Sequence, residues 1–153
     1  RQIVKDQNRE EAQKIEHLQS LKGIGVKGSW GLVCEMFGWR EFKNRKQIGG
    51  YLGATGTPYD SGGTRKEQGI SKAGNGRMRS LMNELAWLWL RHQPDTDLSK
   101  WFHKRTTSGS KRIRRVAIVG LLRKLTVALW RYVEFGIIPN GAVFKTIKLP
   151  KTL

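Results

Sequence analysis

The sequence contains a single cysteine, Cys34, and three widely separated histidines, His17, His92 and His103. One cysteine excludes an internal disulfide and a cysteine-based zinc site within one chain, and the histidines lack the spacing of metal ligands. We therefore expect no metal site and no cofactor held by this chain alone. Cys34 is expected to be a small buried hydrophobic residue.

Long apolar runs are also absent. No segment approaches the roughly 20 apolar residues that a membrane span needs, and no signal-peptide pattern opens the chain. A membrane is therefore not an expected partner, and the cytoplasm is the expected location.

Acidic residues are scarce: 12 Asp and Glu stand against 29 Lys and Arg, which gives a net charge of +17. The imbalance is uneven, because residues 1–60 carry 10 basic and 7 acidic side chains whereas residues 61–153 carry 19 and 5. So much positive charge repels itself in a compact protein unless a polyanion is bound. We therefore expect nucleic acid as the partner.

What the sequence does have is enough apolar material to fold, with 38% hydrophobic residues and six tryptophans among 153 residues. We expect a mainly α fold, a helix-hairpin-helix plus a helical bundle, with an irregular glycine-rich loop or small hairpin. Residues 1–17 are expected to form a linker or coiled-coil-like helix from a missing upstream domain, with a solvated terminal helix as the alternative. Residues 18–135 form the main domain and residues 136–153 a C-terminal arm.

The helix-hairpin-helix expectation comes from the run Gly23-Ile24-Gly25 between two apolar helical patterns. Glycines allow a tight turn with exposed N–H groups, and the turn and the next helix N-terminus can then hold a DNA phosphate. Lys22 and Lys27 flank the turn and would add charge-assisted contacts. The alternative is an ordinary helix turn that needs glycine for a positive φ.

Further helices are expected over residues 44–52, 76–92, 98–107 and 113–135. The first should carry Ile48, Tyr51 and Leu52 inward and end at Gly53, and Asn75 is well placed as the N-cap of the second. Residues 55–76 between them are dense in turn-forming residues. The apolar stripe of the helix over residues 76–92 is read as core packing and comprises Met78, Leu81, Leu85, Leu88 and Trp89.

A basic cluster lies between the last two expected helices. With no acid nearby, these side chains form an electrostatic footprint for a nucleic-acid backbone, although a charge run is often only a solvated face. The cluster comprises Lys104, Arg105, Lys111, Arg112, Arg114 and Arg115.

Four motifs in order carry a resemblance to a known family: residues 21–25 (LKGIG), 51–53 (YLG), 57–62 (TPYDSG) and 70–75 (ISKAGN) with Arg79. Their order and spacing closely resemble the C-terminal transposase domain of the insertion-sequence-one-ten family. These recombinases, some guided by a bridge RNA, pair a RuvC-like nuclease domain with a serine-bearing domain. The resemblance spans roughly residues 18–133.

The resemblance implies that Ser61 attacks a DNA phosphodiester and holds a strand end covalently. Gly62 would allow close approach of the DNA backbone, and Asn75 would position the loop against the next helix. Candidates to neutralise the transferring phosphate are Arg65, Arg77 and Arg79. Without the family, Ser61 is more simply read as a turn residue before Gly62.

The resemblance also implies partners: DNA, a guide RNA in some members, further copies of the full-length protein, and Mg²⁺ in the RuvC-like domain. The resemblance further implies a location at the nucleoid. Because that domain does not precede Arg1 in this sequence, we expect the 153-residue chain to bind nucleic acid but to show little strand transfer by itself. The alternative function is a non-catalytic basic helix-hairpin-helix module that binds nucleic acid.

Overall fold

The computed structural model describes residues 2–38, 41–53 and 75–146. The described residues form helices joined by short connections, and the only β pairing among them is an isolated antiparallel bridge between Leu21 and Phe144. The expectation of a mainly α protein is confirmed. The helices are α1 (Gln2–Ser20), α2 (Val26–Leu32), the π-helix η1 (Val33–Phe37), α3 (Arg45–Leu52), α4 (Gly76–His92), α5 (Asp97–Arg105) and α6 (Lys111–Phe135).

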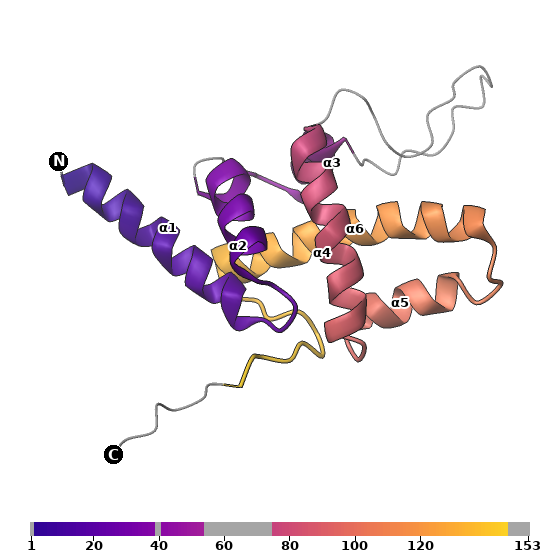
Figure 1. The fold of residues 1–153 in the computed structure, drawn as a ribbon. Coiled ribbons are helices and arrows are strands. Elements are labelled where there is room, and N and C mark those ends of the chain that lie inside the picture. Colours follow the sequence, from indigo (N-terminus) through magenta and orange to yellow (C-terminus); the bar gives the residue numbers. More distant parts are fainter. Residues whose placement is uncertain (1, 39–40, 54–74, 147–153) are drawn as a thin grey trace, which may run out of the picture.

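Helix α6 is the centre of the fold. It packs against α1, α3, α4 and α5, and Figure 1 shows α4 crossing it while α5 runs back alongside it. The face of α6 that meets these helices is apolar, with Leu121, Leu125 and Leu129 all buried. Burial of such side chains contributes about 1.5 to 3 kcal/mol each, so α6 supplies much of the stabilisation.

The second half of α1 also belongs to the core. Ile15 and Leu18 are buried, and Lys14 donates to the carbonyl of Phe37 at 2.7 Å and to the carboxylate of Glu134 at 2.8 Å. These contacts tie α1 to the end of η1 and to the last turns of α6.

The predicted stop at Gly53 and the predicted N-cap at Asn75 are confirmed. Asn44 caps α3 by accepting from the N–H of Gln47, and Gly53 ends it in the left-handed region at φ 72°. Asn75 caps α4 by accepting from the N–H of Met78 at 3.1 Å. Gly53 and Asn75 stand directly before and after residues 54–74. The glycine-rich loop or hairpin expected there lies outside the described residues.

Two burial predictions are wrong. Leu88 is 38% exposed, because it comes one residue before buried Trp89 and is therefore rotated roughly 100° away from the core. Met82, which the predicted stripe did not include, is fully buried on α4. Cys34 is exposed, because its neighbours Val33 and Met36 point inward from η1.

The described part of the C-terminal arm, residues 136–146, is irregular and is attached to the helical body. Lys145 donates its backbone N–H to the carbonyl of Ser20 at 2.8 Å, and Lys22 donates to that of Val143 at 3.0 Å. Within the described ranges, none of the helices combines the length and apolar character that crossing a membrane requires.

Candidate functional site

Ser61, Gly62 and Arg65 fall within residues 54–74 and so lie outside the described residues. The structure does describe the residues that flank this segment. The backbone N–H of Asn75 donates to the carbonyl of Tyr51 at 2.8 Å, so the end of α3 and the start of α4 lie side by side. Tyr51 and Asn75, which stand on either side of residues 54–74 in the sequence, are therefore in direct contact.

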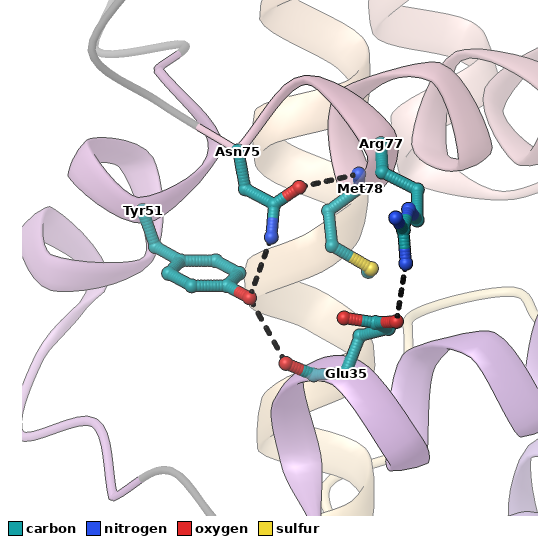
Figure 2. Close-up of polar contacts among 5 residues, drawn as sticks. All are labelled: Glu35, Tyr51, Asn75, Arg77 and Met78. Carbon is teal, nitrogen blue, oxygen red and sulfur yellow. Dashed lines mark hydrogen bonds and ion pairs between the residues drawn. The ribbon is translucent and has the colours of Figure 1, made fainter.

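A polar network holds this contact together (Figure 2). The Asn75 side chain accepts from the N–H of Met78 and donates from Nδ2 to the hydroxyl of Tyr51 at 2.9 Å. That hydroxyl donates in turn to the carbonyl of Glu35 at 2.9 Å. One side chain, Tyr51, thus links η1, α3 and α4.

The two arginines of α4 have different surroundings. Arg79 donates to the carbonyl of Leu52 at 3.1 Å, a cation at the C-terminus of α3 that satisfies one of its last carbonyls. Arg77 pairs with the Glu35 carboxylate at 3.2 Å, yet 81% of its side chain is exposed. Such exposed ion pairs contribute about 0 to 1 kcal/mol, so Arg77 can exchange its partner for another anion, whereas Arg79 is bonded to the end of α3.

Tyr51 and Glu35 are the residues of this site that sequence reasoning missed. Tyr51 belongs to the motif at residues 51–53, but the only role that the sequence predicts for its side chain is to pack inward, with Ile48 and Leu52, from the helix over residues 44–52. The available signal was its hydroxyl, because a tyrosine turned toward a core needs a hydrogen-bond partner. Nothing in the sequence identified that partner, because Asn75 lies 24 positions away.

The Gly23-Ile24-Gly25 turn connects α1 to α2 as predicted. Gly23 has φ 97°, and a Cβ there would lie 3.2 Å from the Cβ of His92, so glycine is required. Gly25 has extended backbone, and a Cβ there would meet nothing within 4 Å. The Gly25 side of the turn is therefore open to a ligand.

The other side of the turn is closed by a buried glutamine. Gln93 donates to the carbonyls of Lys22 at 2.8 Å and Val143 at 2.7 Å, and it accepts from the N–H of Val143 at 2.8 Å. Lys145 adds a bond from its ammonium to the carbonyl of Ile24 at 2.6 Å. The end of α4 and the C-terminal arm thus fix the conformation of the turn.

The lysines that flank the turn are both exposed. Lys22 extends from the turn itself, while Lys27 on α2 pairs with Glu84 of α4 at 3.2 Å. The pair is open to water on both sides, with 79% and 56% of the two side chains exposed. It therefore leaves Lys27 available to a phosphate.

The predicted basic cluster is exposed throughout, and three of its members border two different hollows. Arg105 and Arg112 line a hollow between α5 and α6. Arg114 instead lies over Trp87, 6.0 Å from the ring centroid, and borders a separate hollow with Phe102 and His103. Lys104, Lys111 and Arg115 are exposed at the end of α5 and the start of α6.

A family comparison decides what kind of protein carries these features. Residues 15–101, from the end of α1 through most of α5, match the model of the Transposase IS116/IS110/IS902 family. The chain belongs to this transposase family.

Two proteins of Sinorhizobium fredii (strain NBRC 101917 / NGR234) that carry the name putative transposase are similar to the chain. The first, y4rJ, is 46% identical over 130 residues, which is 84% of this chain and 33% of the length of y4rJ. The second, y4qE, is 33% identical over 95 residues, 62% of this chain and 24% of its own length. The chain therefore spans about a third or less of these relatives. No solved structure matches it.

The family match includes the flanks of residues 54–74 and the glycine turn, but it ends before α6. Helix α6 nevertheless carries basic residues outside the predicted cluster, namely Arg123, Lys124 and Arg131, which line hollows on its surface. In the part of this transposase chain that the structure describes, no three side chains of His, Cys, Asp or Glu lie together as a metal site would need.

Proposed function

We propose that this chain is the DNA-binding and strand-transfer part of a transposase and that Ser61 is its nucleophile. The observation that carries the proposal is the contact between Tyr51 and Asn75, within the family match, which joins the two ends of the segment that contains Ser61. The excess of positive charge in residues 61–153 supports DNA as the ligand.

The proposed reaction is attack of the Ser61 hydroxyl oxygen on a DNA phosphorus. A phosphoserine bond forms, the phosphorus bond to the departing strand breaks, the hydroxyl proton leaves to a base, and the departing oxygen takes up a proton. A serine hydroxyl needs such help to react. Exposed Arg77, with Arg65, would neutralise charge on the phosphate. Gly62 would let the DNA backbone approach, and Arg79 would position the end of α3.

Mg²⁺ enters this proposal only through the rest of the full-length protein. The resemblance implies a RuvC-like domain that binds it, and none of the described residues forms a group of carboxylates fit to hold it. No step of the proposed Ser61 reaction is assigned to Mg²⁺. We propose further that the 153-residue chain binds DNA but transfers strands poorly alone, and that the full-length protein acts as an oligomer, with a guide RNA as a further partner.

The test uses the full-length protein that contains this chain and labelled duplex DNA carrying an end of its insertion sequence. Wild type should form a covalent protein–DNA adduct that survives denaturing electrophoresis, and Ser61→Ala should abolish it. Ser80→Ala, at an exposed position of α4, is the matched control and should leave the adduct intact. An adduct that persists in Ser61→Ala overturns the proposed nucleophile, and absence of any adduct in wild type favours a non-catalytic DNA-binding module.

A further inference from the structure

Two open hollows run along the surface of α6 and meet in its middle. One, of about 870 Å³, lies between α6 and α5, and the other, of about 700 Å³, lies between α6 and α3. Arg123 and Lys124 line both of them. The two hollows therefore form one continuous surface, which we call the α6 groove.

The charge of the α6 groove has one sign. Among the described residues that line it, none is acidic, and seven are basic. They come from the consecutive helices α5 and α6 and from α3, which is distant from both in sequence, so the fold gathers charges that no single sequence segment displays. The seven are Arg45, Lys46, Arg105, Arg112, Arg123, Lys124 and Arg131.

The floor of the groove is built around Trp101. A Cβ at position 120 would lie 2.9 Å from the Trp101 ring, so Gly120 lets the ring lie directly against α6. The cations of Arg105 and Lys124 lie 5.2 and 5.0 Å from the ring centroid. The ring is thus occupied by cations, which makes it a support for the positive side chains and not a platform for stacked bases.

Like charges lie close together at the centre of the groove, where Arg123 and Lys124 line both hollows. Partial burial lowers the pKa of Lys124, and the neighbouring charges of Arg123, Arg105 and Arg45 lower it further. Positive charges held this close stabilise a bound anion and are stabilised by it.

The length of the groove favours a polymer over a small anion. Its basic positions on α6 extend from Arg112 to Arg131, roughly 28 Å along the helix at 1.5 Å per residue. A duplex at 3.4 Å per base pair presents about eight base pairs over that length. Such a span suits a row of phosphates on a nucleic-acid backbone.

We infer that the α6 groove binds the phosphate backbone of duplex DNA, as a second contact surface separate from the glycine turn and from the segment that contains Ser61. The inference rests on the proposed function in one respect, that DNA is the ligand of this chain. Of the sequence-predicted cluster it uses only Arg105 and Arg112.

The test compares two triple variants of the 153-residue chain on a labelled 30-base-pair duplex. The groove variant is Arg45→Gln/Lys46→Gln/Arg131→Gln, three exposed residues whose replacement should leave the fold intact. The control, Arg9→Gln/Arg91→Gln/Lys100→Gln, removes the same charge at exposed positions that do not line the groove. Circular dichroism and thermal unfolding check that both fold.

We expect the groove variant to lose about tenfold or more in DNA affinity near 0.15 M salt and its log–log salt slope to fall by about 2 to 3, since each phosphate contact contributes about 0.9. The control should lose clearly less. Equal affinities of folded groove and control variants overturn the inference. A third variant, Lys104→Gln/Lys111→Gln/Arg115→Gln, separates the groove inference from the proposed function. If only this variant loses DNA affinity and the groove variant does not, the proposed function stands and the groove inference is overturned. A wild-type chain that does not bind DNA removes both.

Discussion

Asn75 and Tyr51 are joined twice, by a backbone hydrogen bond of 2.8 Å and by a side-chain hydrogen bond of 2.9 Å between Nδ2 and the Tyr51 hydroxyl. The two residues are 24 positions apart. Bringing together two residues that far apart in the sequence costs chain entropy that specific contacts must offset. The pair therefore stabilises the base of the segment that carries Ser61.

Removing the Tyr51 hydroxyl should weaken this base. In Tyr51→Phe the Glu35 carbonyl and the Asn75 amide each lose a partner, which should lower the free energy of unfolding by about 1 to 3 kcal/mol. Urea unfolding followed by circular dichroism measures it. Tyr132→Phe, which loses one bond to Ser20, is the control and should have a smaller effect. Equal midpoints for wild type and Tyr51→Phe would contradict the structural role.

The glycine turn gives a pair of substitutions with different expectations. Gly23→Ala places a side chain at φ 97° and 3.2 Å from the Cβ of His92, so the folded state should lose about 1 to 2 kcal/mol. Gly25→Ala meets open space and loses only the preference for glycine over alanine at the N-cap of α2, so it should lower the unfolding midpoint less than Gly23→Ala. Thermal unfolding of both variants tests this difference, and a Gly25→Ala variant that is the less stable of the two would contradict the turn geometry.

The same Gly25→Ala variant tests the predicted phosphate contact. A methyl group on the open side of the turn would obstruct a phosphate that approaches the backbone N–H groups. If the turn binds DNA, affinity should fall several-fold while the chain stays folded. Retained affinity would leave the turn as a structural connection only.

Local signals predicted the helices and their ends well. Asn75 is a side-chain cap and Gly53 is a left-handed stop, and both signals depend on residues within one turn. The errors at Leu88 and Cys34 have a local cause too. A helical stripe read from sequence has a wide edge, and a rotation of one residue decides which side chain reaches the core.

The relationships that the sequence did not reveal are long-range. The partners of Gln93 lie 50 and 71 positions away, and the α6 groove joins Arg45 of α3 to Arg105 of α5. Patterns of spacing describe neighbours along a chain, so they cannot indicate which distant charges the fold brings together. The predicted basic cluster was therefore assigned by sequence proximity, whereas the fold places Arg105 and Arg112 in one hollow and Arg114 in another.

Gln93 should be a strong determinant of stability. Its amide is buried and makes three hydrogen bonds to the turn and the C-terminal arm. Gln93→Leu keeps the volume but leaves the Val143 N–H and the Lys22 carbonyl without this partner, which should cost about 2 to 4 kcal/mol. Gln13→Leu, at an exposed position of α1, should change stability by less than about 0.5 kcal/mol. Chemical unfolding of both variants measures the difference in the free energy of unfolding. Equal stabilities would refute the stabilising role of the Gln93 hydrogen bonds.

Lys124 should make DNA binding depend on pH in the alkaline range. In the free protein its pKa is lowered by burial and then by Arg123, Arg105 and Arg45, with Lys46 in the same groove. A bound phosphate favours the charged ammonium and so raises this pKa. Between the two values the complex holds more protons than the free protein, so affinity should fall as pH rises through the lowered pKa and should be insensitive to this group below it.

Lys124→Arg separates this effect from the general loss of charge at high pH. A guanidinium stays protonated across the range and can still lie over Trp101, so the variant should retain binding while losing the component of the pH dependence that Lys124 supplies. Fluorescence anisotropy at fixed ionic strength from pH 7.5 to 10 gives both curves. A wild-type curve that is parallel to that of Lys124→Arg would mean that no phosphate reaches Lys124, and DNA would then have to contact the chain away from the centre of the α6 groove.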